Sequence, residues 1–312
     1  MNAAIADEEH EPEPGVKQTC SPSEPVSEAA AQGLLEPAPE VLELLFKMSC
    51  HDGQAAVVVL GNKIYATHYW SCTLDVYNAA NFNSLPPIAM YDIHHPTCIA
   101  ASERDRLLFV GDMWSSWVHA IGPDDNRRTH WNPGGPFIGI SVACGGSNVV
   151  VAFSEQQLLT EFSPFGRVIR HIRLASRLTR LELLRAPLLI KPIHAISLSD
   201  ERMVLCQVGR ICVVDDTGKV QCSCPGPMSK RALGQFDPVH VALDSSGRLF
   251  VVDCSNNRIV ILTLALDLIR TFSTAPQGLR QPLSLAIDEK HGQLCVASAI
   301  GQAFVYGFDF SA

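Results

Sequence analysis

The chain has no long hydrophobic run and carries little charge. No stretch of 18 or more apolar residues occurs among its 312 residues, whereas a membrane-spanning helix needs about 20. Charged residues make up 18% of the chain and aromatic residues 7%, against 47% for apolar residues. We therefore expect no membrane-spanning helix, and the composition supports a large hydrophobic core.

Features of an exported protein are also missing. The cysteines number eleven, so intrachain disulfides cannot pair all of them. Residues 1–14 are acidic and contain no apolar stretch like the core of a signal peptide. No Asn-x-Ser/Thr acceptor site for glycosylation occurs. These features predict a reduced, cytoplasmic protein.

The net charge of −8 belongs to the first fifty residues. Residues 1–50 hold ten acidic and two basic side chains, while the rest of the chain holds 22 of each. Six of the 20 prolines lie in this segment, with a single aromatic residue, Phe46. Such a composition buries too little apolar surface to offset the loss of chain entropy on folding. We therefore predict that residues 1–50 form a disordered acidic arm.

A short helix is predicted near residues 39–48 of this arm. Pro39 suits a first helical turn, and Glu40 and Glu43 suit its electropositive end. The residues that follow are strongly apolar. The helix could dock on the folded body or bind a partner.

An internal repeat of about 45 residues organises the rest of the chain. Each repeat has an apolar run after a proline anchor, then two further apolar runs and an outer strand, separated by polar turns. The anchors are Pro96, Pro136, Pro192, Pro238 and Pro282. A unit over residues 55–77 lacks the proline but fits the pattern, which gives six units. Four short strands per unit are typical of propeller blades, so we predict an all-β, six-bladed β-propeller over residues 51–312.

One unit carries a more specific motif. Residues 238–259 read Pro-x-x-Val-Ala-Leu-Asp-x-x-Gly-x-Leu-Phe-Val-Val-Asp-x-x-Asn-x-Arg-Ile. This motif resembles the NHL repeat, the blade of NHL β-propellers of the type found in tripartite-motif proteins. The resemblance assigns a structural repeat signature to Asp253, Asn256 and Arg258. In the last unit, Ser298 and Ala303 replace the aspartate and the arginine.

The resemblance implies a recognition role rather than ligase chemistry. Similar propellers bind substrates or RNA as the recognition arms of tripartite-motif ubiquitin ligases, and others act as scaffolds. This chain has no Cys-x-x-Cys pair, so it has no RING or B-box. Because one fold serves many functions, this implication rests on analogy.

Related propellers also include a peptide-amidating lyase that holds a central zinc with histidines. His194 and His240 stand two residues after their proline anchors, at the repeat position of Cys98. In the lyase pattern the histidine directly follows the proline, and an offset of one residue turns a side chain to the other face of a strand. We expect the two histidines to pack between blades. The weaker alternative is a metal site formed by His194, His240 and Cys98.

Other catalytic motifs are missing from the chain. It contains no Gly-x-Ser-x-Gly, His-Glu-x-x-His or phosphate-binding Gly-x-x-x-x-Gly-Lys sequence. Asp244 and Asp288 occupy turn positions of the repeat, where aspartate has a structural role. We expect no catalysis and no cofactor. A propeller hydrolase or lyase with a metal ion in the central channel is the third hypothesis.

Two groups of residues are candidates for binding a partner. Residues 167–191 hold one acid and seven bases: Arg167, Arg170, Arg173, Arg177, Arg180, Arg185 and Lys191. A basic patch suits RNA, although the neutral body is unlike most nucleic-acid binders, and the acidic arm could cover the patch instead. The second group is Trp70, Trp114 and Trp117, because tryptophan is enriched at binding hot spots. Tryptophans in loops can equally brace neighbouring blades.

These features together predict a non-catalytic, monomeric scaffold that binds a protein partner. The alternative is the recognition arm of a ubiquitin-ligase-like or RNA-regulatory assembly, which would bind through residues 167–191.

Overall fold

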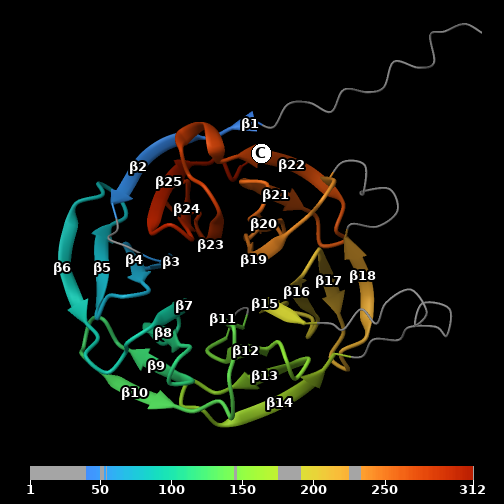
Figure 1. The fold of residues 1–312 in the computed structure, drawn as a ribbon, viewed down its shortest axis with the longest axis horizontal. Helices are drawn as coiled ribbons and strands as arrows, with labels where there is room; N and C mark the ends of the chain where they lie inside the picture. The colour runs from blue at the N-terminus through green and yellow to red at the C-terminus, as the bar shows by residue number, and fades with distance from the viewer. Residues whose placement is uncertain are drawn as a thin grey trace, which may run out of the picture. The chain divides into compact units, whose positions relative to one another are not determined.

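Six β-sheets form a ring in the part of the chain that the structure describes (Figure 1). The computed structural model describes residues 40–49, 53, 55–143, 146–174, 191–224 and 233–311. All of them belong to the compact unit Ala38–Ala312, and the other unit is Met1–Pro37. The predicted six-bladed, all-β propeller is confirmed. Residues 1–39 of the predicted disordered arm lie outside the described residues.

Five blades are consecutive four-stranded antiparallel stretches of the chain, and each runs from the axis outwards. Blade 1 contains β3 (Ala55–Leu60), β4 (Lys63–His68), β5 (Thr73–Asn78) and β6 (Ser84–Ala89). Blade 2 contains β7 (Pro96–Ser102), β8 (Leu107–Asp112), β9 (Trp117–Ile121) and β10 (Arg128–Trp131). Blade 3 contains β11 (Gly139–Val142), β12 (Val149–Phe153), β13 (Leu158–Phe162) and β14 (Val168–Arg173).

The remaining blades follow the same order. Blade 4 contains β15 (Pro192–Ser197), β16 (Met203–Gln207), β17 (Arg210–Val214) and β18 (Val220–Cys224). Blade 5 contains β19 (Pro238–Leu243), β20 (Leu249–Asp253), β21 (Arg258–Leu262) and β22 (Leu268–Ser273). Blade 6 contains β23 (Pro282–Asp288), β24 (Gln293–Ser298) and β25 (Gln302–Gly307). A 3₁₀ turn, η3 (Ala275–Gln277), lies between blades 5 and 6.

The ring closes through the segment that the sequence predicted as a helix. That prediction is wrong: β2 (Glu43–Ser49) is the outer strand of blade 6 and pairs antiparallel with β25, so the propeller begins before residue 51. Just before it, β1 (Glu40–Val41) adds to the outer edge of blade 5 in parallel with β22. A strand satisfies backbone groups at an otherwise open sheet edge, which a docked helix does not.

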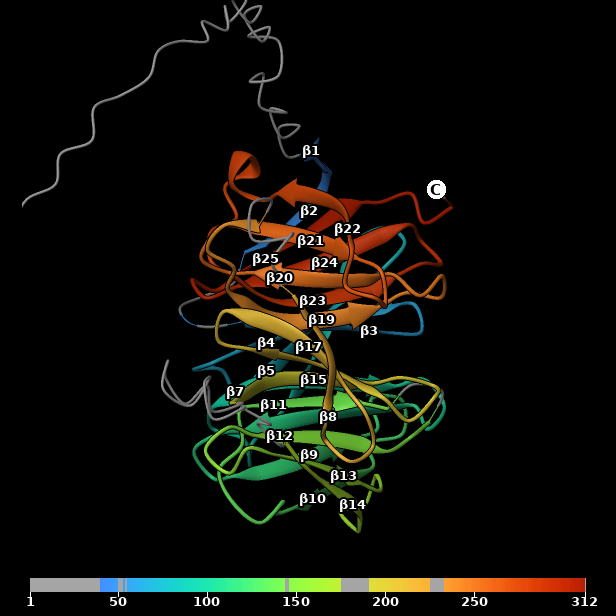
Figure 2. The same cartoon turned by 90° about the vertical axis from the view of Figure 1, so that its right-hand side faces the viewer.

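The hydrophobic core lies between blades rather than within them. Six clusters of buried apolar side chains occur, one at each junction of neighbouring blades, including the junction of blades 6 and 1. Figure 2 shows the sheets stacked face to face from the side. Each blade therefore buries its apolar faces only against its neighbours, as in other repeat architectures. No helix of the described residues is long and apolar enough to cross a membrane.

The proline anchors mark a repeated β-bulge in four inner strands. The register of pairing shifts directly after Pro96, Pro192, Pro238 and Pro282. Proline cannot donate a ladder hydrogen bond, so it suits the start of a strand or a bulge. The bulge inserts one residue and re-aims the next side chain. It therefore sets the direction of Cys98, His194, His240 and Ser284 near the axis.

Candidate functional site

Among the described loops, exposed large apolar side chains gather at one end of the ring. In an antiparallel blade, the loop between the second and third strands emerges at the same end as the loop that leads to the next blade. We call this end the recognition face. Its described loops carry seven exposed large apolar side chains: Trp70, Tyr91, Met113, Trp114, Ile138, Val208 and Ile300. In the described loops of the opposite end, Phe165 is the only one.

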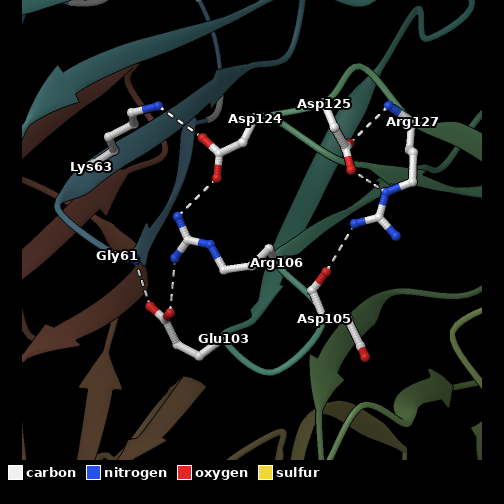
Figure 3. A network of polar contacts seen from close by, with 8 residues as sticks. All are labelled: Gly61, Lys63, Glu103, Asp105, Arg106, Asp124, Asp125 and Arg127. Atoms are coloured by element: carbon white, nitrogen blue, oxygen red, sulfur yellow. Dashed lines mark hydrogen bonds and ion pairs between the residues drawn. The ribbon is translucent and has the colours of Figure 1, made fainter.

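Several exposed ion pairs lie together at the opposite end, where blades 1 and 2 meet (Figure 3). Arg106 contacts Glu103 Oε2 at 3.1 Å and Asp124 Oδ2 at 2.9 Å. Lys63 Nζ lies 3.1 Å from Asp124 Oδ1. Hydrogen bonds from Arg106 and Lys63 lower the pKa of Asp124. Exposed pairs of this kind add little stability.

Four rings pack together on the recognition face where blades 1 and 2 meet. We call Tyr69, Trp70, His95 and Trp114 the aromatic cluster. The His95 ring stacks on Trp114 with centroids 4.3 Å apart, and it contacts Tyr69 at 5.0 Å and Trp70 at 4.9 Å. Trp114 Nε1 donates a hydrogen bond to the Tyr69 hydroxyl at 2.9 Å. Trp70 and Trp114 are nevertheless 64% and 71% exposed, so the cluster presents two indole rings to solvent.

The buried carboxylate of Asp112, the last residue of β8, fixes the loops of this cluster. Its Oδ1 accepts hydrogen bonds from the N–H groups of Trp114 at 3.0 Å and Ser115 at 3.3 Å. Its Oδ2 accepts from the N–H of His94 at 3.2 Å. Burial alone would raise the pKa of Asp112, but backbone hydrogen bonds from His94, Ser115 and Trp114 together lower it. The ionised carboxylate therefore ties the Trp114 loop to the segment that carries His95.

The other two tryptophans lie outside the aromatic cluster. Trp117 begins β9, is partly buried, and packs edge-on against His130 with centroids 4.9 Å apart. Trp131 is buried and packs against Phe162 of blade 3 at 4.7 Å. Trp131 thus braces two blades, while Trp117 stays within blade 2. Of the three tryptophans predicted to bind a partner, the structure brings Trp70 and Trp114 into one cluster.

The predicted basic patch falls on and beyond the outer strand of blade 3. The described members of the predicted partner-binding set are Arg167, Arg170 and Arg173, and those outside the described residues are Arg177 and Arg180. Arg170 Nε lies 2.7 Å from Glu161 Oε2. Lys191 Nζ lies 2.8 Å from Glu155 Oε1. Two of the basic groups are therefore paired with acidic groups of blade 3, whereas Arg167 and Arg173 are exposed.

The repeat signature of blade 5 braces a loop. Asp253 Oδ2 accepts hydrogen bonds from Arg258 Nε at 2.6 Å and from Asn256 Nδ2 at 2.9 Å. Asp253 Oδ1 accepts from the N–H of Asp237 at 3.0 Å. Arg258 Nη2 also donates to the carbonyl of Leu233. The three signature residues thus hold the β20–β21 loop against the segment that leads into β19.

Two cavities follow the axis of the ring. One of about 310 Å³ lies beside Met113 and Ile138 of the recognition face. The other, of about 410 Å³, reaches Glu289 towards the opposite end. Four residues line both cavities and form the constriction between them: Ile99, Ile140, His194 and His240.

The two histidines of this constriction stack on each other. Their ring centroids are 3.9 Å apart and the planes are inclined by 21°. Burial lowers the pKa of His194 to about 4 and that of His240 well below its usual value. Zinc lies about 2.0–2.1 Å from a ligating nitrogen, along its lone pair in the ring plane. Two nearly parallel planes at this separation do not meet at that range, so the observed ring geometry does not let the pair share a metal ion.

Cys98, the third weak metal candidate, does not complete a cluster. Burial raises the pKa of its thiol to about 12. Within the described ranges, no group of three or more His, Cys, Asp or Glu side chains is arranged to hold a metal ion.

The described residues form a six-bladed β-propeller that exposes aromatic side chains at one end. Its fold is similar to that of a solved structure of Kuenenia stuttgartiensis hydrazine synthase, with a TM-score of 0.55 and 12% sequence identity. The match covers 81% of this chain and 94% of that chain. At this identity the likeness shows the fold alone. No protein-family model matches the sequence, and no curated protein matches it.

Sequence patterns alone do not single out His95 as part of the site. It lies in a loop that has no regular period, and it contacts Tyr69 and Trp114 only because blades 1 and 2 meet there. The one available signal is its place directly before the anchor Pro96, since anchors begin inner strands and the preceding residues form the loops of the recognition face.

Proposed function

We propose that this chain is a non-catalytic, cytoplasmic scaffold of the NHL type that binds a protein partner through its recognition face. The supporting observation is the uneven distribution of exposed apolar side chains, seven at one end against one at the other in the described loops. Exposed apolar patches mark interaction sites in soluble proteins, and Trp, Tyr and Met are enriched at interfaces.

Two further features support this proposal. The Asp253–Arg258 pair has geometry that suits the structural role implied by the NHL motif. The odd number of cysteines suits a reducing compartment.

Capture experiments with the full chain would test the proposal. Trp114 and Phe165 are both 71% exposed but lie at opposite ends of the propeller, so Phe165→Ala is a matched control for Trp114→Ala. We expect Trp114→Ala to weaken retention of the main cytosolic partner at least tenfold, roughly 1.4 kcal/mol, and Phe165→Ala to leave it unchanged. If the Trp70→Ala/Trp114→Ala double variant retained the partner as well as the wild-type chain does, the proposal would be contradicted.

The second candidate function is the recognition arm of an RNA-regulatory assembly. Two exposed arginines favour it: Arg167, directly before β14, and Arg173, the last residue of β14. The pairing of Arg170 with Glu161 weakens it. Binding through these arginines predicts RNA retention that falls with salt and that is lost in an Arg167→Gln/Arg173→Gln variant.

A further inference from the structure

The larger of the two axial cavities, here called the channel pocket, has apolar walls and an acidic mouth. Its volume is about 410 Å³, which lies within the range of about 300–1,000 Å³ that is usual for small-molecule sites. The constriction between the two cavities bounds its inner end. Its outer end reaches Ser245 and Glu289, which follow β19 and β23 at the end of the ring opposite the recognition face.

The walls of the channel pocket offer apolar surface to a ligand. They come from the inner strands of all six blades and consist mainly of valine, isoleucine, leucine and alanine. Five of these side chains, one each from blades 1, 2, 3, 5 and 6, are only partly buried: Val59, Ala101, Val142, Leu243 and Ile287. Covering them with an apolar group releases the water beside them, which is favourable. An apolar body of suitable size is therefore stabilised in the pocket.

The charged side chains that line the channel pocket are both acidic. Asp244 is paired, since Arg248 Nε lies 2.6 Å from its Oδ2. Glu289 instead accepts hydrogen bonds from Ser245, with its Oε1 2.7 Å from the N–H and its Oε2 bonded to the hydroxyl. Among the described residues, no basic side chain lies within ion-pair distance of Glu289. One carboxylate at the mouth is therefore without a counter-charge in that part of the chain.

This carboxylate has acceptor capacity left for a cation. A carboxylate offers about four acceptor positions, and Ser245 uses two of those of Glu289. The ammonium of the adjacent Lys290 bonds to blade 1, where its Nζ donates to Asn62 Oδ1 at 2.5 Å. The two bonds from Ser245 also hold the Glu289 side chain in place, so less conformational entropy is lost when a ligand binds.

We propose that the channel pocket binds a small apolar amine, with its apolar body against the inner-strand walls and its ammonium group hydrogen-bonded to Glu289. A hydrogen bond between an ammonium and a carboxylate is strengthened by both charges. An anionic ligand would place a second negative charge beside Glu289, which Coulomb repulsion disfavours. The pocket opens at the end opposite the recognition face, so this inference goes beyond the proposed binding of a protein partner and does not depend on it.

The probes for this proposal are 1-adamantanamine, 1-adamantanol and 1-adamantanecarboxylate. They share one rigid apolar body and are cationic, neutral and anionic at pH 7. In equilibrium dialysis with the full chain at low salt, we expect the amine to bind about threefold more tightly than the alcohol, or better, because Glu289 is exposed and exposed ion pairs are weak. The carboxylate should bind most weakly. High salt should reduce the advantage of the amine, because it screens an exposed charge.

A matched pair of variants tests the role of the carboxylate. Glu289→Gln keeps an acceptor for Ser245 and removes the charge, so this variant should bind the amine and the alcohol equally. Glu155→Gln makes the same change at an exposed residue of the recognition face and should keep the preference for the amine. A preference that persists in Glu289→Gln would overturn the proposal.

Two further variants place the probes. Val59 and Leu243 line the channel pocket from blades 1 and 5, so Val59→Trp and Leu243→Trp each insert an indole into it, and either suffices if the other fails to fold. We expect each folded variant to weaken binding of the amine and the alcohol by about tenfold or more, roughly 1.4 kcal/mol. Unchanged binding in these variants would overturn the proposal by placing the probes outside the pocket. Failure of the wild-type chain to bind the amine, or equal affinity for the amine and the alcohol, would overturn it as well.

Discussion

The indole nitrogen of Trp114 donates a hydrogen bond to the hydroxyl of Tyr69 at 2.9 Å, across the junction of blades 1 and 2. The same indole stacks on His95 and remains largely exposed. One side chain therefore contacts the neighbouring blade and is also exposed to solvent. A binding anchor held in place beforehand loses less conformational entropy when the partner binds.

We expect Trp114→Ala and Tyr69→Phe to separate these two roles. Tyr69→Phe removes only the hydroxyl, so it should lower the free energy of unfolding by about 1 kcal/mol or less and weaken partner binding slightly. Trp114→Ala also removes the exposed ring, so it should weaken binding at least tenfold, about 1.4 kcal/mol or more. Urea unfolding and titration of the captured partner measure the two quantities. A loss of binding in Trp114→Ala no larger than in Tyr69→Phe would assign the indole to bracing alone.

Asp112→Asn tests the clamp on the aromatic cluster. The change removes the charge that accepts three backbone hydrogen bonds, so we expect a loss of about 1–3 kcal/mol in the free energy of unfolding at pH 7. Because folding lowers the pKa of Asp112, its contribution is fully present above the unfolded value and is lost as the pH falls through the folded one. The difference in free energy of unfolding between wild type and Asp112→Asn should therefore become smaller as the pH falls. The exposed Asp216→Asn variant is the control. A difference in the free energy of unfolding between wild type and Asp112→Asn that does not change with pH would argue against the clamp.

His194 makes a second pH-dependent contribution to the free energy of unfolding, in a higher pH range than that of Asp112. Its pKa is about 4 in the folded chain, below the ordinary value of 6.5, so between these values the unfolded chain binds a proton that the folded chain does not. Stability is thus fully present above pH 6.5 and falls as the pH drops towards 4, by about 3 kcal/mol for this group. Urea midpoints at pH 7 and pH 5 should differ less for His194→Phe than for wild type. His130→Phe should keep the wild-type difference.

The propeller was predictable because short stretches of the sequence show the pattern of each strand in the repeat. Runs such as Leu249–Asp253 and Arg258–Leu262 are apolar, short and bounded by turn residues. The spacing of the five proline anchors gives the length of the repeat. The binding site was only partly predictable. Trp70 and Trp114 stand out in the sequence by residue type, whereas their contacts with His95 depend on how two blades meet, which no pattern within one blade encodes.

The helix predicted near residues 39–48 failed for a local and a distant reason. A β-bulge shifts the register between Leu44 and Phe46, so apolar residues follow one another and the alternation expected of a strand is broken. The segment is a strand only because β25, far along the chain, offers it an edge. The local spacing of apolar residues does not reveal that a strand distant in the sequence, such as β25, will pair with this segment.

Met48 tests ring closure by this strand. Its side chain is only 1% exposed and packs in the cluster between blades 6 and 1, so Met48→Ala should leave a cavity at the closing junction and cost about 2–4 kcal/mol. Leu45, at the bulge of the same strand, is 40% exposed, and Leu45→Ala should cost less than about 1 kcal/mol. Urea unfolding followed by tryptophan fluorescence measures both losses. Of these two side chains, only Met48 packs in the junction between blades 6 and 1. If Met48→Ala and Leu45→Ala cost the same free energy of unfolding, β2 would stabilise the ring through its backbone pairing with β25 alone.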